Sequence, residues 1–199
     1  MELTDAVRRR RMVRSYDPRR PVAAAALEAI VHTALRAPSA GFTQGTSLLL
    51  LSTPVDRSAF WQATAAEKTN RWLAGMQTAP VLMVVWTSRE DYLDRYAESD
   101  KGWSDRDLDR WSAPYWFVDA GMASMGALLS AVDAGLGACF FGIPPDRVAV
   151  VRETFGVPVE QLFVGVVAVG YPDPDAAPLG SPRRRPRKPV GQLLHRGRW

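Results

Sequence analysis

The chain has 199 residues, 47% of them hydrophobic, which is enough for one substantial core and indicates a single domain over residues 1–199. Its first residues form no apolar leader, and its longest apolar run, Ala79 to Trp86, is too short to cross a bilayer. One cysteine excludes an internal disulfide bond, so we expect a cytoplasmic protein with no membrane partner.

The net charge of +4 conceals an acidic body between two basic ends. Residues 8–20 hold seven arginines and one acid, and residues 176–199 hold seven basic side chains and no acid. Residues 21–175 carry 11 basic and 18 acidic side chains, whereas a nucleic-acid binder usually spreads basic charge over a whole face. We therefore expect no nucleic-acid partner. The basic ends are either solvated tails or two halves of a site for one small anion.

The first half of the chain is predicted to alternate helices with buried strands. A short helix that Thr4 or Asp5 can cap runs on to Tyr16, where Asp17-Pro18 breaks it. The other expected elements are a helix over 23–35, a polar loop over 37–45, a buried strand over 47–51, a helix over 56–72 and a buried strand over 79–86. The last strand lacks alternation of apolar and polar residues, which predicts burial on both faces.

Residues 88–112 interrupt this pattern with a charged segment that must cross the surface. The segment carries eight acids and five bases, and Gly102 divides it into two short amphipathic helices. It also carries four aromatic residues: Tyr92, Tyr96, Trp103 and Trp111. It is either a solvated excursion or a lid whose aromatic side chains cover a pocket.

The stretch from Pro114 to Ile143 is predicted to contain the central helix of the fold. Ser112 can cap this helix, Pro114 suits its first turn, and Gly135 ends it. One face carries the large apolar residues Phe117, Met125, Leu128 and Val132. A second face carries the small residues Ala120, Ala123, Ala127, Ala131 and Ala134. Because small residues let a second helix come close, we expect this stripe to face a neighbouring helix, including one across a dimer interface.

The remaining elements complete a layered architecture. They are a short strand over 136–141, a helix from Pro144 to Phe155, a strand over 162–169 and an extended basic segment over 173–199 with a short turn at 190–194. Buried strands joined through helices predict a mixed α+β or α/β arrangement.

Several kinds of site are excluded by composition. Two histidines and one cysteine are too few for a zinc site, so we expect no metal. The sequence contains no nucleophile elbow, no Walker loop and no dinucleotide Gly-x-Gly-x-x-Gly. We interpret His32, His195 and Cys139 as structural or solvated. Covalent catalysis by a side chain is therefore not expected, and a bound cofactor would have to carry any reaction.

Three separated pieces of the chain together resemble the FMN-dependent nitroreductase family. They are Arg10-Arg11-Met12-Val13-Arg14-Ser15-Tyr16, then Ala37-Pro38-Ser39-Ala40, and then a set running from Val118-Asp119-Ala120-Gly121 through Gly135-Leu136-Gly137 to Val167-Ala168-Val169-Gly170-Tyr171-Pro172 and Arg185-Pro186-Arg187-Lys188-Pro189. The pieces keep the family's order and cover nearly the whole chain.

The resemblance implies an α+β homodimer with a nitroreductase-like fold: a central mixed sheet flanked by helices, and a long central helix in the dimer interface. It implies that Arg10, Arg11, Arg185 and Arg187 grip the FMN phosphate, for which guanidinium groups are suited. Met12 would lie in the cofactor site, and Arg14 would lie beside the pyrimidine edge of the flavin. Pro38, Ser39 and Ala40 would come from the partner subunit, and Gln44, which matches the family's residue, would also bind the cofactor. Gly142 would bring its backbone amide close to the flavin ring.

The implied activity is ping-pong hydride transfer from NAD(P)H through FMN to a small oxidised acceptor, such as a nitroaromatic, a quinone or an enone. The substrate side of the site would use Phe42, Tyr96, Trp103, Trp111 and Phe141. Met12 and Phe42 depart from the family's usual Ser and Asn, so we expect the polar contacts to the flavin to be fewer or rearranged. Two alternatives stay open: a flavin-binding protein for storage or sensing without turnover, and a deazaflavin in place of FMN.

Overall fold

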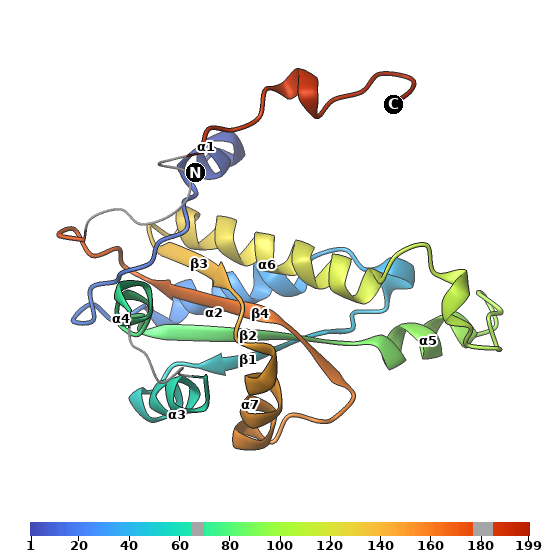
Figure 1. The fold of residues 1–199 in the computed structure, drawn as a ribbon, viewed down its shortest axis with the longest axis horizontal. Coiled ribbons are helices and arrows are strands. Elements are labelled where there is room, and N and C mark those ends of the chain that lie inside the picture. Colours follow the sequence, from blue (N-terminus) through green and yellow to red (C-terminus); the bar gives the residue numbers. More distant parts are fainter. Residues whose placement is uncertain (65–69, 177–184) are drawn as a thin grey trace.

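The computed structural model describes residues 1–64, 70–176 and 185–199, which form helices on both sides of one sheet (Figure 1). The α-helices are α1 (Leu3–Arg9), α2 (Ala24–Leu35), α3 (Pro54–Thr64), α4 (Arg71–Met76), α5 (Arg89–Ala97), α6 (Tyr115–Asp133) and α7 (Val148–Phe155). The strands are β1 (Thr46–Leu51), β2 (Val81–Ser88), β3 (Gly137–Phe141) and β4 (Gln161–Gly170). Short 3-10 turns lie at η1 (Ala40–Phe42), η2 (Leu108–Arg110), η3 (Pro145–Arg147) and η5 (Val190–Gln192).

The four strands form a sheet in the order β1-β2-β4-β3. All three pairings are antiparallel, with Val84 opposite Val166 at the centre. The α+β class is confirmed. The predicted mixed sheet is corrected, since within the described residues the parallel pairing found is a single bridge between Met12 and Ala138. Strands joined through helices are often parallel neighbours, but here β2 and β4 run in opposite directions.

Two apolar cores lie on opposite faces of the sheet (Figure 1). Leu82, Val84 and Trp86 of β2 pack toward α3, α4 and α7. The intervening residues of β2, which include Met83 and Val85, pack toward α2 and α6. All eight residues of β2 are buried, which confirms the prediction drawn from its missing alternation.

The central helix α6 ends as predicted, with Gly135 at a φ of +73°, but it begins at Tyr115, and its N-cap residue is Pro114 rather than Ser112. The small-residue stripe faces a neighbouring helix, as predicted, but that helix belongs to the same chain rather than to a second subunit. Ala120, Ala123, Ala127 and Ala131 are at most 2% exposed and pack within the same chain, in the core shared with α2. A Cβ added to Gly126 would lie 3.3 Å from the backbone oxygen of Thr33, so α2 is the helix that the small residues admit. The exposed face instead carries Phe117, Val118, Met122 and Met125, each 39–44% exposed.

By length and composition, α6 is also the one helix of the described residues that could cross a membrane. Its small-residue face lies in the interior of the fold, as expected for the core helix of a layered domain.

Other element boundaries differ from the predictions. The first helix ends at Arg9 rather than at Tyr16, because Met12 pairs with Ala138 of β3 and Tyr16 pairs with Pro172, just after β4. The helix expected over 56–72 is divided: α3 ends at Thr64, and Asn70 caps α4 by accepting a hydrogen bond from the Leu73 N–H (2.9 Å). The part of this predicted helix at residues 65–69 lies outside the residues that the structure describes.

Strand β1 was predicted to be buried, and most of it is not. It lies at the edge of the sheet, where Leu50 is 39% exposed and Leu51 is buried. In the 88–112 segment, α5 confirms the first predicted helix. The second is reduced to the short turn η2.

Candidate functional site

The segment from Arg10 to Tyr16 lies extended along the edge of β3. The Val13 N–H donates to the Ala138 oxygen (3.0 Å). At the far end, the Tyr16 hydroxyl donates to the Val13 oxygen (2.7 Å), and its burial raises the pKa of this phenol. These contacts hold the segment in place, and the bridge from Met12 to Ala138 extends the sheet by one pairing.

Successive side chains of an extended segment point to opposite sides, and this separates the arginines. One terminal nitrogen of Arg10, Nη1, is buried and has no hydrogen-bond partner among the residues that the structure describes. Arg14 is half-buried and donates from Nη1 to the Met12 oxygen (2.9 Å). The Met12 sulfur accepts from the Phe140 N–H (3.4 Å), so this side chain is turned toward β3. Arg10, Met12 and Arg14 are every second residue of the segment and therefore lie on the same side of it.

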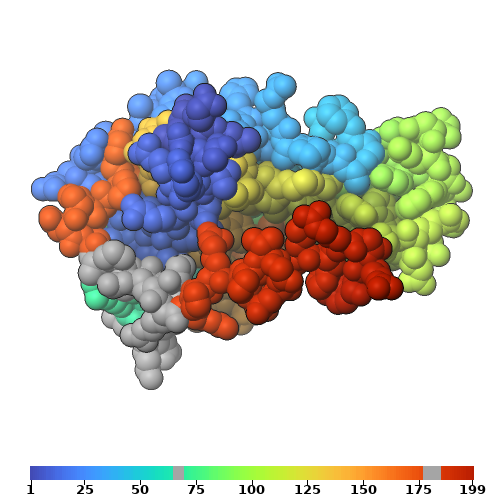
Figure 2. Space-filling model, turned by 90° about the horizontal axis from the view of Figure 1, so that it is seen from above, coloured from blue at the N-terminus to red at the C-terminus, as the bar shows by residue number. Residues whose placement is uncertain are grey.

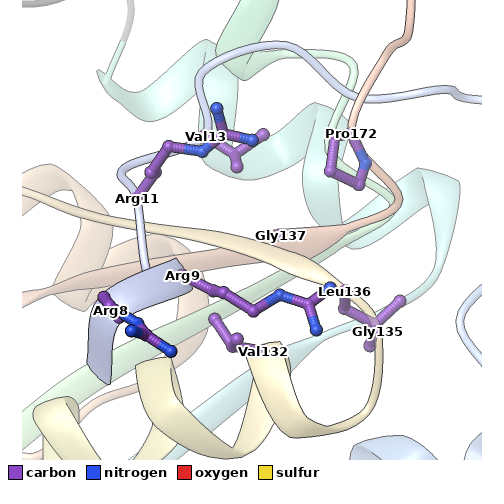
Figure 3. A pocket seen from close by; sticks show the side chains of 9 residues that line it. All are labelled: Arg8, Arg9, Arg11, Val13, Val132, Gly135, Leu136, Gly137 and Pro172. Carbon is purple, nitrogen blue, oxygen red and sulfur yellow. The ribbon is translucent and has the colours of Figure 1, made fainter. Parts of the chain in front are cut away.

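Arg11 lines a different space, a surface hollow of about 410 Å³ shown in Figure 3. Arg8 and Arg9 line it from α1, and its apolar lining is Val13, Val132, Leu136 and Pro172. Arg8 also pairs with Asp5. Helices α1 and α6 both end at this hollow, and the carbonyl groups at a helix C-terminus attract cations. The positive charge of these arginines is thus favoured by the two helix C-termini.

The end of β3 combines a buried aromatic residue with an open glycine. Phe141 is 8% exposed and stacks on Trp61 with ring centroids 5.9 Å apart, in the core beneath α3 and α4. A Cβ added to Gly142 would meet nothing within 4 Å. The backbone at Gly142 is therefore accessible to a ligand.

The loop from Pro38 to Gln44 is folded tightly and carries unusual backbone angles. Phe42 and Gln44 have φ values of +57° and +58°, and Gly41 has +61°. Left-handed conformations at non-glycine residues cost about 1–3 kcal/mol each and are maintained where surrounding contacts impose them. The Gln44 N–H donates to Ser39 Oγ (2.9 Å), and the Phe42 ring is 75% exposed.

The aromatic side chains of the 88–112 segment pack on one another. Trp111 lies at the centre, with its ring centroid 4.5 Å from that of Tyr96 and 5.4 Å from that of Trp103. It also contacts Trp116 at the start of α6. A Cβ on Gly41 would lie 2.8 Å from Tyr96, so this cluster adjoins the Pro38–Gln44 loop.

The structure therefore brings the predicted site residues together in two separate groups. Arg10, Met12 and Arg14 lie beside β3, which ends at Phe141 and Gly142. The second group is the Pro38–Gln44 loop with the aromatic cluster. Arg185 and Arg187 are exposed on a C-terminal arm that projects from the body on the side of α6 and α1 (Figures 1 and 2).

Sequence reasoning missed Asp119, which is 3% exposed and contacts the Pro38–Gln44 loop. Its Oδ2 accepts hydrogen bonds from the Ala40 N–H (2.8 Å) and from the Tyr92 hydroxyl (2.7 Å). A signal was present, because Asp119 is one of two charged residues in an otherwise uncharged helix. A buried carboxylate in such a helix requires hydrogen-bond donors from elsewhere in the fold.

Phe42 offers a direct test of the strained loop. Phe42→Asn should raise the free energy of unfolding by about 0.5–1 kcal/mol, because asparagine adopts positive φ more readily than phenylalanine. Urea denaturation measures this change. Phe42→Ala is the control, since alanine removes the exposed ring and keeps the unfavourable φ. Equal stabilisation by both variants would mean that exposure of the ring, not the backbone angle, carries the cost.

Among the described residues there is no cluster of three or more His, Cys, Asp or Glu side chains that could hold a metal ion.

Comparison with known proteins places this geometry in context. The sequence profile described as Nitroreductase family matches residues 7–171. An NADH dehydrogenase from Thermus thermophilus is 27% identical over 195 residues, covering 89% of this chain and 90% of the relative.

Solved structures show the same fold. A nitroreductase-type protein from Exiguobacterium sibiricum 255-15, in complex with FMN, superposes with a TM-score of 0.73 at 17% identity, covering 98% of this chain and 97% of that one. A second FMN complex, from Desulfovibrio desulfuricans, gives a TM-score of 0.72 at 21% identity, covering 100% and 98% of the two chains.

Proposed function

The chain belongs to the nitroreductase family, and we propose that it is an FMN-dependent oxidoreductase that uses NAD(P)H to reduce a small oxidised acceptor. The observation that carries the proposal is the Arg10–Arg14 segment held beside β3, which leaves a buried guanidinium nitrogen of Arg10 without a partner among the described residues. Buried polar groups are normally satisfied, so this nitrogen is suited to a ligand anion. The FMN complexes of proteins with this fold, and the dehydrogenase relative, support the choice of cofactor and donor.

The residues present fit FMN in three respects. Arg10, together with Arg185, Arg187 and Arg11, would supply charge-assisted hydrogen bonds to the phosphate. Arg14 would place positive charge near the flavin ring, and the open backbone at Gly142 would approach the ring closely. Met12 would contribute an apolar contact in place of a hydroxyl group. When bound, FMN supplies the redox chemistry by accepting hydride from NAD(P)H and passing it to the acceptor.

We propose that the functional unit is a homodimer, with the Pro38–Gln44 loop of one subunit facing the β3 end of the other. This arrangement would join the two groups of site residues that one chain keeps apart. Three exposed apolar surfaces support it: Leu3 and Val7 of α1, the exposed face of α6, and Val190, Leu193 and Leu194 of the C-terminal arm. All three belong to elements on the same side of the sheet (Figure 1), and exposed apolar surfaces of this kind are typical of interaction sites.

A visible absorption spectrum tests the proposal. Purified protein should be yellow, and anaerobic addition of NADPH or NADH should bleach it, with the more efficient nucleotide identifying the donor. A yellow protein that neither nucleotide bleaches would support storage or sensing instead. A deazaflavin would give a distinct spectrum. The protein for this test should be expressed in the cytoplasm, because we propose a cytoplasmic location.

We further propose that Phe42, Tyr96 and Trp103 line the binding site for the acceptor. Trp103→Ala should change the KM or kcat for a nitroaromatic several-fold while flavin content stays normal, because Trp103 lies at the margin of the aromatic cluster. Trp111→Ala is the matched control. The Trp111 ring joins the cluster to α6, so the Trp111→Ala protein should also have a lower melting temperature. Parallel loss of flavin and activity in Trp103→Ala would assign Trp103 to the core instead.

A further inference from the structure

We infer that Asp119 is a positioning residue that holds the Pro38–Gln44 loop ready for the cofactor ring, an inference that rests on the proposed function. The loop contains residues that the proposed site takes from the partner subunit, and Asp119 itself touches neither cofactor nor substrate. Its role is to fix where the loop lies.

The first support is the position of the carboxylate. Asp119 is buried in α6 at 3% exposure, and no ion pair to it is found within residues 1–64, 70–176 and 185–199. Burying a carboxylate without a cation is costly, and hydrogen bonds must offset that cost. Both donors converge on one oxygen, Oδ2: the backbone N–H of Ala40 and the hydroxyl of Tyr92. One buried atom thus joins the loop, α5 and α6.

The second support is that Tyr92 extends this contact to the other end of the loop. A Cβ placed on Gly45 would lie 2.6 Å from Cε2 of Tyr92, so the ring packs directly on the loop's exit. The Gly45 oxygen accepts from the Ser88 N–H (3.0 Å) and from Thr87 Oγ1 (3.2 Å). Asp119 and Tyr92 therefore fix the beginning and the end of the loop together.

The third support is the strain between these two fixed ends. Phe42 and Gln44 have positive φ, a conformation that non-glycine residues in a free loop would rarely maintain. Arg95 Nε donates to the Gly41 oxygen (2.8 Å) and adds a contact at the middle of the loop. Removing the Asp119 acceptor should let the beginning of the loop relax, and a relaxed loop must be reordered when the cofactor binds.

The experiment compares Asp119→Ala, Asp119→Asn and Tyr92→Phe with Asp133→Ala. Asp133 serves as a control because it is an exposed carboxylate at the end of the same helix, paired with the N-terminal amine (2.6 Å). Hydrogen exchange of residues 37–45 is measured in flavin-free protein, with residues of β2 and β4 as internal references. FMN affinity is measured separately by titration of flavin fluorescence.

Asp119→Ala should speed exchange at Ala40 and its neighbours, and should weaken FMN binding about ten- to a hundredfold, while β2 and β4 exchange as in wild type. Asp119→Asn keeps an oxygen that can accept both bonds, so its FMN affinity should stay within about threefold of wild type. Tyr92→Phe keeps the ring against Gly45 and loses one donor. Its effects on exchange and on FMN affinity should therefore lie between those of Asp119→Asn and Asp119→Ala. Asp133→Ala should change neither measurement.

The outcomes separate the two proposals. Wild-type protein that fails to bind FMN overturns the proposed function, and exchange alone then decides whether Asp119 holds the loop. Unchanged exchange at residues 37–45 in Asp119→Ala overturns the inference, as does faster exchange with wild-type FMN affinity in a protein that binds FMN. If Asp119→Ala does not fold, Tyr92→Phe decides: wild-type exchange and affinity in that variant would overturn the inference.

Discussion

Arg10→Ala and Arg187→Ala should each weaken FMN binding ten- to a hundredfold, which makes them the most informative substitutions at the two basic ends. A charge-assisted hydrogen bond contributes about 1.5–3 kcal/mol, and each 1.4 kcal/mol changes affinity tenfold. Arg10 already has a buried nitrogen that lacks a partner in the described structure, whereas Arg187 is exposed on the C-terminal arm. Convergence of both on one phosphate would explain why two distant segments are basic.

Riboflavin provides the control for this prediction, and Arg11→Ala is measured beside the two variants. Riboflavin has no phosphate, so its affinity should be nearly the same in wild type and in both variants. Arg11 lines the hollow in Figure 3 rather than the space beside Arg10, so the effect of Arg11→Ala measures whether that neighbour also reaches the phosphate. Arg10→Ala and Arg187→Ala should couple in a double-mutant cycle, since they would share one ligand group. Small, additive effects that are equal for FMN and riboflavin would identify the basic ends as solvated tails.

The fold was largely predictable because its strongest local signals agree with its tertiary packing. An unbroken apolar run gave β2, and the glycine after an apolar stretch gave the end of α6. The small residues of α6 were correctly predicted to meet a helix, but periodicity does not show whether that helix belongs to the same chain. Ala127 lies in the core and Met125 at the surface because α2 packs closely against the small residues.

The site was less predictable because long-range pairing determines it. Helical propensity in the arginine-rich segment suggested continuation to Tyr16, but the hydrogen bond from Val13 to Ala138 joins residues 125 positions apart and favours an extended chain. Likewise, the contact of Asp119 with Ala40 spans 79 positions. The residue types were readable from the sequence, whereas their partners depended on the folded sheet.

Ala127→Glu and Met125→Glu should have different effects although the two residues lie two positions apart on α6. Ala127 is fully buried, so a glutamate there places an unpaired charge in the core and should cost about 3–5 kcal/mol. That is a large part of the roughly 5–15 kcal/mol that stabilises a native protein. We therefore expect Ala127→Glu to unfold or aggregate, with loss of helical circular dichroism.

Met125 is 39% exposed in the single chain, so Met125→Glu should leave the fold of the monomer intact. If the exposed face of α6 is the dimer interface, the introduced charges would be buried against a second copy and should block association. Light scattering coupled to size exclusion should then show a folded monomer that has lost its flavin, because the partner's loop no longer completes the site. Met125→Leu, which keeps an apolar side chain of similar volume, should remain dimeric and yellow. A Met125→Glu protein that stays dimeric and flavin-loaded would place the interface elsewhere, and a flavin-loaded monomer would show that one chain is sufficient to hold the cofactor.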